Sequence, residues 1–442
     1  MESLVKWKDD PNKRALLITG ARQIGKTYIV RAFAKKYYEN FVEINMITEP
    51  RAISIFDGNL DAETLISNIT AYVSRPLVPG KTLIFFDEIQ ECPNARTAIK
   101  SLVDDGRFDY IESGSLLGVN YKEVRSYPVG YEEQLYMYPL CFREFAIALG
   151  VQRQTFDLLE DCYNNKKKVS DVIHKKMLEI FRYYVIVGGM PAVVQQFINT
   201  NDIGDVIKIQ RDILKLYRQD ISKYAQKNKI KIKDIFDNIP AQLNDANRRF
   251  ILSSVSSTAR MERYQESFMW LSDAGVALPC YNVTEPRTPL QLSKKSNIFK
   301  LFLSDTGLLC AASMENVQFD ILQGNLSVNM GSILENVFAQ QLKEKGFSLC
   351  YMNKKSLGEI DFILQSGKSI IPVEIKSGND YNKHTSLNKL LLVDEWNIRK
   401  AYVFCKGNVL VSDAINYLPW YMIIFFVKEP IENKKLEINI DI

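Results

Sequence analysis

The feature that most constrains the fold of this sequence is a glycine-rich loop at residues 20–27. It reads Gly-Ala-Arg-Gln-Ile-Gly-Lys-Thr, which has the G-x-x-x-x-G-K-[ST] spacing of a phosphate-binding P-loop. The apolar run 15–19 before it is typical of a buried parallel strand, and residues 28–36 after it are typical of a helix. A strand, a glycine turn and a helix start together form an anion cradle. The alternative, a chance match in an ordinary turn, does not account for these flanking elements.

The positions of the loop have distinct expected roles. Gly20 and Gly25 let the backbone approach a ligand closely, and the Lys26 side chain would reach the terminal phosphates. The Thr27 hydroxyl would hold Mg²⁺. Backbone N–H groups of the loop would point at the phosphate oxygens, so the expected binding site also includes Ala21, Arg22, Gln23 and Ile24.

Two acidic residues end a second apolar run at 81–88, which reads Lys-Thr-Leu-Ile-Phe-Phe-Asp-Glu. This is the Walker B pattern, and open α/β sheets bind ligands at that edge. Asp87 would hold Mg²⁺, directly or through water, and Glu88 would polarise the attacking water. The pattern alone is common, but one β-α-β interval after a P-loop makes it specific. Together the two motifs predict hydrolysis of ATP, with Mg²⁺ as the second cofactor.

Polar residues follow the next expected strand, around 110–118. P-loop ATPases of the AAA+ type place a sensor of the γ-phosphate at this strand end, and the candidates are Ser113 and Ser115. A plain strand-to-helix turn is the alternative. Arg125 lies before the last expected strand of the domain, where an arginine that completes the site of a neighbouring subunit is often found. A solvated surface arginine is the alternative for Arg125.

The length and composition of the chain set its broad class. A chain of 442 residues is expected to contain two to four domains. With 46% hydrophobic and 24% charged residues, the composition is that of an ordinary globular protein. A net charge of +4 is too small to decide on nucleic-acid binding. Seven scattered Cys without a C-x-x-C pair, and only two His, argue against a zinc site and a disulfide framework.

Neither end of the sequence indicates a membrane. Residues 1–10 contain no apolar segment typical of a signal peptide. The apolar run 422–427 is far too short to span a bilayer. A cytoplasmic protein with no membrane partner is therefore expected.

Several motifs together resemble one family. These are GARQIGKT, LIFFDE, ESGSLLG, PVG, LYMYPLCFREF and YVIVGGMP, the last at 184–191. They resemble prokaryotic AAA+-like ATPases with a C-terminal domain of unknown function, related to the archaeal-type ATPases. The resemblance covers nearly the whole chain, and GARQIGKT and VGGMP are its most specific parts. The sequence departs from it at Tyr131, where many relatives have Arg or Lys after the glycine.

The middle of the chain is expected to form two units. Helices at 171–187 and 203–224 resemble the helical lid of AAA+ proteins, and a simple helical packing domain is nearly the same prediction. After them, three short helices and two strands look like the winged helix of the family; the segments are 233–243, 250–256, 261–274, 276–283 and 299–303. Arg260 and Arg263 begin the third helix beside Glu262 and Glu266. Both phosphate contact and a purely structural or protein-binding role therefore remain open.

Charged residues in the last part of the chain form a nuclease-like pattern. Strands are expected at 359–364 and 370–377, and alternate residues of a strand share a face. Glu359 and Asp361 are therefore expected to point the same way, as are Glu374 and Lys376. This Glu … Asp … Glu-x-Lys pattern resembles the core of PD-(D/E)xK nucleases.

The chemistry of these residues fits metal-dependent cleavage of nucleic acid. Asp361 and Glu374 would hold Mg²⁺, which activates water and stabilises charge on the scissile phosphate. Lys376 would orient that water or stabilise the transition state. Glu335, on a helix expected at 331–345, would complete the metal shell. The alternatives are a surface acidic strand paired with a lysine, or an inactive nuclease fold that only holds nucleic acid.

The sequence thus predicts an α/β protein with four parts. They are a P-loop AAA+-like core at 1–150, a helical lid at 151–228, a winged-helix-like unit at 229–310 and a restriction-endonuclease-like domain at 311–442. The predicted function is an ATPase coupled to a nuclease-like domain that binds nucleic acid, DNA rather than RNA. A homo-oligomer is compatible with this. The alternative is a nucleotide-dependent regulatory or scaffold protein whose nuclease-like domain is catalytically silent.

Overall fold

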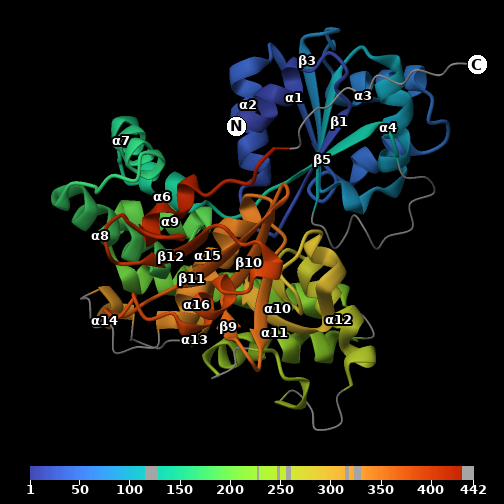
Figure 1. Cartoon of the computed structure of the whole chain (residues 1–442). Coiled ribbons are helices and arrows are strands. Elements are labelled where there is room, and N and C mark those ends of the chain that lie inside the picture. Colours follow the sequence, from blue (N-terminus) through green and yellow to red (C-terminus); the bar gives the residue numbers. More distant parts are fainter. Residues whose placement is uncertain are drawn as a thin grey trace, which may run out of the picture.

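The computed structural model describes the chain of 442 residues except for 115–127, 226–227, 246–248, 255–259, 314–317, 323–329 and 431–442. Figure 1 shows an N-terminal α/β unit beside a larger body of helices and two further sheets. No helix in the described part of the chain is long and apolar enough to cross a membrane.

The N-terminal unit is built on a parallel five-stranded sheet. Its order is β2-β3-β4-β1-β5, and every neighbouring pair is parallel. The strands are β1 (Ala15–Thr19), β2 (Asn40–Asn45), β3 (Thr82–Asp87), β4 (Asp109–Ser113) and β5 (Glu132–Tyr136). Four helices belong to this unit: α1 (Glu2–Asp9), α2 (Lys26–Tyr37), α3 (Ala62–Val73) and α4 (Pro93–Asp105).

Strands β1 and β3 are buried along their whole length because helices cover both faces of the sheet. On one face the sheet packs against α1 and α2 through Trp7, Phe33, Leu16, Ile18, Leu83 and Phe85. On the other face it packs against α3 and α4 through Leu65, Ile99, Leu17, Ile84, Phe86 and Tyr110. Continuous apolar strands are what a doubly covered parallel sheet requires. The carboxyl ends of the central strands consequently share one edge, where a ligand crevice forms.

Helices dominate the middle of the chain. They are α6 (Phe142–Ala148), α7 (Arg153–Asn164), α8 (Asp171–Val187), α9 (Pro191–Thr200), α10 (Ile203–Tyr224), α11 (Lys229–Asn244) and α12 (Met261–Asp273). The predicted helix at 250–256 is wrong over its described part, because only the 3₁₀ turn η4 (Leu252–Ser254) forms there. The Phe250 N–H instead donates a hydrogen bond of 2.9 Å to the Phe299 carbonyl. Phe250, in the short segment after α11, thus lies beside the strand that contains Phe299.

Two further sheets follow. One has the order β7-β6-β8-β9, with β6 (Ala277–Val283), β7 (Lys294–Leu303), β8 (Cys350–Lys354) and β9 (Gly358–Ile360). The other has the order β10-β11-β12-β14-β13, with β10 (Phe362–Ser366), β11 (Ser369–Ile375), β12 (Ala401–Cys405), β13 (Leu410–Ser412) and β14 (Ile415–Pro419). The remaining helices are α13 (Thr306–Ser313), α14 (Gln318–Leu322), α15 (Met330–Glu344) and α16 (Thr385–Leu391).

The strand arrangement differs from the expected one at two places. In the four-stranded sheet, β6 pairs with β8. This sheet therefore joins residues from both sides of the domain boundary that the sequence predicts between 310 and 311. The strand expected at 359–364 is interrupted at Asp361, and its two halves belong to different sheets. Glu359 and Asp361 therefore do not lie on one face of one strand, and that expectation is wrong.

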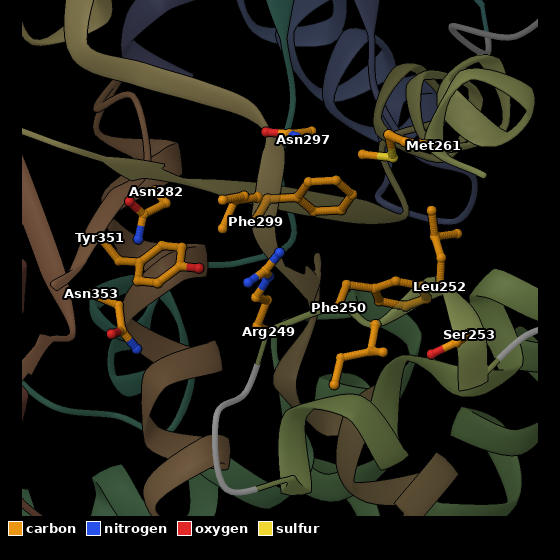
Figure 2. A pocket seen from close by; sticks show the side chains of 12 residues that line it. Arg249, Phe250, Leu252, Ser253, Met261, Asn282, Asn297, Phe299, Tyr351 and Asn353 are labelled. Atoms are coloured by element: carbon orange, nitrogen blue, oxygen red, sulfur yellow. The ribbon is translucent and has the colours of Figure 1, made fainter. Parts of the chain in front are cut away.

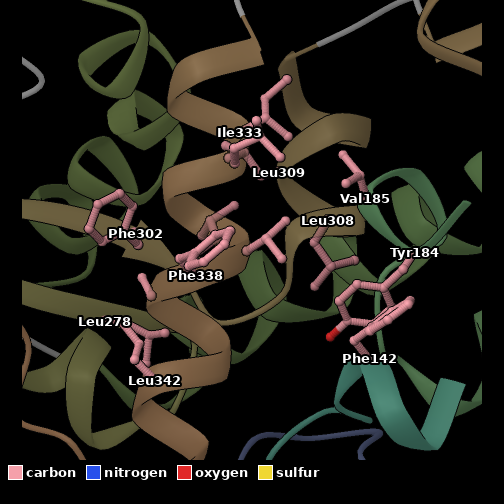
Figure 3. Packing of buried hydrophobic residues seen from close by; sticks show 14 of the residues in the cluster. Phe142, Tyr184, Val185, Leu278, Phe302, Leu308, Leu309, Ile333, Phe338 and Leu342 are labelled. Carbon is pink, nitrogen blue, oxygen red and sulfur yellow. The ribbon is translucent and has the colours of Figure 1, made fainter. Parts of the chain in front are cut away.

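Helix α15 lies at the centre of the largest hydrophobic core. Figure 3 shows Ile333, Phe338 and Leu342 of this helix packed among side chains of β6, β7, α13 and the segment around Tyr184. The same core extends to Ala21 and Ile24 of the glycine-rich loop. The loop is therefore packed against the helical middle of the chain as well as against its own sheet.

A glycine pair forms the turn between α8 and α9. The Gly189 N–H donates a hydrogen bond of 2.6 Å to the buried carboxylate of Asp305, and the Leu140 N–H donates one of 2.7 Å to the Gly189 carbonyl. A side chain at Gly188, whose φ is +73°, would collide with the Asp305 carboxylate, and one at Gly189 would collide with the backbone of Leu140. Close approach thus explains the glycines of the VGGMP motif.

We predict that Gly189→Ala lowers the free energy of unfolding by roughly 2–4 kcal/mol, because the added methyl group overlaps the Leu140 backbone. Gly378→Ala is the matched control, since nothing lies within 4 Å of a Cβ at that position. The control should change stability by less than about 1 kcal/mol. Urea unfolding followed by circular dichroism measures both, and equal effects would contradict this account of the turn.

Candidate functional site

The glycine-rich loop connects β1 to the N-terminus of α2, as the sequence predicts. Gly25 precedes the helix with φ of +87°, and Gly20 has φ of +143°. A Cβ at Gly20 would overlap the Met137 carbonyl and the Ile24 side chain, so only glycine fits there. The first N–H groups of α2 have no partner within the helix and are available to an anion.

The Lys26 side chain is folded into this loop. Its Nζ donates hydrogen bonds of 3.1 Å to the Gly20 carbonyl and 2.9 Å to the Ala21 carbonyl. Burial lowers the pKa of Lys26 to about 8, although the carboxylates of Glu88 and Asp87 act in the opposite direction. The ammonium therefore lies in a partly dehydrated cradle, where an anionic ligand would favour its charged form.

Asp87 collects hydrogen bonds from three other elements. Its Oδ2 accepts from the Thr27 hydroxyl at 3.0 Å and from Asn45 Nδ2 at 2.9 Å. Its Oδ1 accepts from the Ser113 hydroxyl. The structure thus brings Thr27, Asp87 and Ser113 together at the carboxyl edge of the sheet. The sequence motifs do not predict Asn45. Its only sequence signal is that a polar residue ends β2, and in the sheet Asn45 lies opposite Asp87 of β3.

Glu88 follows β3 in an unusual backbone conformation. Its φ of +56° and ψ of +43° lie in the left-handed region, which a residue with a side chain seldom adopts. Its carboxylate accepts a hydrogen bond from the Gln90 side chain. Backbone strain of this kind is concentrated at functional sites, because the surrounding structure must hold it in place.

Helix α10 contacts the loop directly. Arg22 Nη1 lies 2.7 Å from Asp220 Oδ1, and the Tyr217 hydroxyl donates a hydrogen bond of 3.2 Å to the Arg22 carbonyl. Burial raises the pKa of Asp220, and the Arg22 guanidinium opposes that shift. Pro191 of the VGGMP motif lies 3.7 Å from the Cβ position of Gly25. The helical middle of the chain therefore forms one wall of the loop.

The other residues predicted for this site are not part of this cluster. Ser115 and Arg125 lie outside the described residues. The Tyr131 carbonyl accepts a hydrogen bond from the N–H of Ala15, the first residue of β1. Tyr131 thus lies at the end of the sheet opposite the glycine-rich loop.

A second group of charged residues lies in the C-terminal part of the chain. Asp361 and Glu374 are 8% and 4% exposed, and Lys376 Nζ lies 3.2 Å from Glu374 Oε2. Asp361 Oδ2 accepts a hydrogen bond of 2.8 Å from the Ile375 N–H. Burial, and then the neighbouring Asp361 carboxylate, raise the pKa of Glu374 to about 8. The predicted Asp361, Glu374 and Lys376 are therefore brought together.

Glu335 and Glu359 lie instead around a buried lysine. Lys300 Nζ, on β7, is 3.0 Å from Glu335 Oε2 and 2.6 Å from Glu359 Oε1. Among the described residues, no group of three or more His, Cys, Asp or Glu side chains is arranged to hold a metal ion. The predicted metal shell of Glu335, Asp361 and Glu374 thus stays a prediction. Lys300 was missed, and its only signal is a lysine within the apolar run 299–303.

Three family models match separate parts of the chain. Residues 12–146 match an AAA domain, so the glycine-rich loop and the acidic strand end lie within such a domain. Residues 178–318 and 330–423 match two domains of unknown function, DUF8612 and DUF4143. No curated protein matches the sequence.

Solved structures show only weak overall likeness. An Aeropyrum pernix ORC1 protein in complex with DNA is 13% identical, with 73% of this chain and 90% of that chain covered and a TM-score of 0.27. The Thermotoga maritima RuvB Holliday junction branch migration motor is 15% identical, with coverage of 65% and 88% and a TM-score of 0.28. C. elegans PCH-2 is 13% identical, with coverage of 36% and 44% and a TM-score of 0.21. Likeness at this level does not bear on function.

We predict that nucleotide affinity depends on pH through Lys26. Bound phosphates favour the charged ammonium of Lys26. In the ligand-free protein the pKa of Lys26 is about 8, so at higher pH Lys26 must take up a proton when the nucleotide binds. Affinity for a fluorescent ADP analogue should be constant from about pH 7 to 7.5 and then fall, towards about tenfold per pH unit above pH 8.5. Lys26→Arg stays charged over this range and is the control. A wild-type affinity that does not change up to about pH 9.5 would contradict the prediction.

Proposed function

We propose that this protein binds and hydrolyses ATP at the glycine-rich loop and that this reaction controls a metal-dependent, nuclease-like site in its C-terminal part. The observation that carries the first half is the convergence of Thr27 and Ser113 on Asp87, beside the Lys26 cradle. The match of residues 12–146 to an AAA domain supports the same assignment. Nucleic acid, DNA rather than RNA, is the proposed partner.

The residues around Asp87 fit a magnesium ion. Mg²⁺ prefers oxygen ligands and usually combines one or two protein oxygens with water and substrate phosphates. The Thr27 hydroxyl and the Asp87 carboxylate, 3.0 Å apart, supply such oxygens. Asn45 and Ser113 fix the orientation of the carboxylate, as hydrogen-bond partners of metal ligands commonly do. When bound, Mg²⁺ would neutralise charge on the nucleotide phosphates.

Protein groups would supply the remaining chemistry. The backbone N–H groups at the start of α2 would bind phosphate oxygens, and the Lys26 ammonium would offset their charge. Glu88 would orient the attacking water and accept its proton, held in position by its strained backbone and by Gln90. Arg125 of a neighbouring subunit in a homo-oligomer would complete the site. A cytoplasmic location is part of the same proposal.

The C-terminal site also fits a divalent cation. Asp361 and Glu374 are both buried carboxylates. Burial, and then repulsion by the Asp361 carboxylate, raise the pKa of Glu374 to about 8, so that Glu374 readily binds a proton. A cation between the two carboxylates would remove that repulsion. When bound, the cation would activate a water molecule for attack on a phosphodiester. Lys376, which is partly exposed beside Glu374, would stabilise negative charge on the phosphate.

One observation favours a second candidate function. Lys300 already neutralises Glu335 and Glu359, which leaves a pair of carboxylates rather than the predicted set of three. In this alternative the C-terminal part is catalytically silent and serves a nucleotide-dependent scaffold or regulator. Cleavage assays distinguish the two functions.

For the ATPase site, Lys26→Ala should abolish nucleotide binding because the phosphates lose their cation. Glu88→Gln should bind ATP with wild-type affinity and hydrolyse it at least about 100-fold more slowly, since the proton acceptor is lost. Phosphate release and fluorescent-nucleotide titration measure the two properties. Glu91→Gln removes the same charge three residues away and should leave the rate unchanged. Equal hydrolysis by Glu88→Gln and wild type would remove Glu88 from this role.

For the C-terminal site, Asp361→Asn should abolish cleavage of plasmid, single-stranded DNA or RNA with Mg²⁺ or Mn²⁺, while binding of the nucleic acid persists. Addition of Mn²⁺ should raise the unfolding temperature of the wild type and not that of Asp361→Asn, because the ion stabilises only the folded pair. Asp380→Asn is the control, since Asp380 is exposed in the same part of the chain. Absence of wild-type cleavage on every substrate would leave the silent alternative.

A further inference from the structure

A cavity of about 630 Å³ lies where the segment after α11 meets the sheet of β6, β7 and β8. Figure 2 shows Arg249 at its centre, with Asn282, Tyr351 and Asn353 on one side and Phe250 on the other. Its volume is in the range of sites for small organic ligands. None of the motifs that define the ATPase or the carboxylate pair contributes a residue to it.

An irregularity in the sheet shapes this cavity. Tyr281 pairs with Phe299, but its neighbour Asn282 pairs with Lys295, so residues 296–298 of β7 have no partner on β6. Two of these three residues, Asn297 and Ile298, line the cavity. A bulge of this kind turns side chains away from the regular strand faces and often lies beside a binding site.

The lining combines an apolar floor with a polar rim. Phe250 and Tyr351 are 7% and 1% exposed and form the buried part, whereas Arg249, Asn297 and Asn353 are exposed. The lining includes one guanidinium and three amides but no carboxylate. The lining therefore offers no negative charge that would bind a cation. A nucleotide, with a flat base, hydrogen-bonding edges and a phosphate, matches each of these groups.

The cavity is connected to the carboxylate pair through one side chain. Asn353 Nδ2 donates a hydrogen bond of 2.7 Å to Glu359 Oε2. Asp361 follows Glu359 by two residues, a separation of at most about 7 Å along the chain. A strand whose phosphate lies at Asp361 and Glu374 would thus have a neighbouring nucleotide within reach of the cavity.

We infer that this cavity binds one unpaired nucleotide of a nucleic-acid strand held at the C-terminal site. This inference rests on the nucleic-acid binding proposed above and adds a preference for single strands. Arg249 binds the phosphate, and the amides of Asn282, Asn297 and Asn353 bind the base edge. The base packs against the accessible apolar side chains of the lining, which are Ile251, Leu252 and Met261. A duplex cannot fill the cavity without first unstacking a base.

Binding of labelled oligonucleotides tests this with the full chain. Fluorescence anisotropy in EDTA, which prevents cleavage, compares a single-stranded oligonucleotide with its duplex. Arg249→Ala and Asn297→Ala, both at exposed positions, should each weaken single-strand binding at least about tenfold and leave duplex binding unchanged. Lys175→Ala removes one charge from an exposed position of α8 and should change neither.

Photocrosslinking locates the bound base independently of affinity. An oligonucleotide with 5-iodouracil should crosslink to Met261 or to the segment 249–253, identified by mass spectrometry of the digested protein. Free mononucleotide should compete only weakly, because it lacks the phosphate contacts of the flanking strand. Crosslinks that lie only outside the cavity lining would overturn the inference.

The outcomes also separate this inference from the proposal on which it rests. If the wild type binds neither single strands nor duplexes, then nucleic-acid binding itself is wrong and the cavity assignment falls with it. If the wild type binds single strands and the Arg249→Ala and Asn297→Ala variants bind them equally well, only the cavity assignment is wrong.

Discussion

The buried carboxylate of Asp305 is the contact on which the assembly of this chain depends. It accepts hydrogen bonds from the Gly189 N–H at 2.6 Å and from the Leu308 N–H at 3.0 Å, so it joins the turn after α8 to the start of α13. Burial raises its pKa to about 6, and the backbone donors oppose that shift. The turn held in this way presents Pro191 to Gly25 of the nucleotide loop. A polar contact outside both sites thereby helps to set how the helical middle meets the AAA domain.

The two charged sites differ in how far their carboxylates are satisfied. Asp87 has a partner on three sides and is organised before any ligand binds. Asp361 and Glu374 face each other, and Lys376 only partly compensates their repulsion. A pair of this kind is destabilising unless a proton or a cation joins it, which is a common cost of a functional site. The first site is thus organised before a ligand binds, whereas the second would gain stability from a bound cation.

Local patterns explain which parts could be predicted from sequence. The glycine loop and the acidic strand end were found because each motif is contiguous and its neighbours have the required periodicity. Asn45 and Lys300 were missed because their partners lie on other strands or on helix α15, and neither strand register nor helix packing can be read from one sequence. The strand through Asp361 was predicted as continuous because charged and apolar residues alternate there as in a strand, although the chain changes sheets at that point. The division of the chain into four parts stays a prediction.

The ion pair between Arg22 and Asp220 has a thermodynamic consequence. It fixes α10 to the nucleotide loop at 2.7 Å, and α10 packs in turn against α11, whose end leads to Arg249. A ligand that alters the conformation of the loop would act on this ion pair, and so would a ligand that moves α10. Linkage then requires the two ligands to alter each other's binding free energy by the same amount. The ion pair between Arg22 and Asp220 is thus the contact through which α10 would respond to a ligand at the loop.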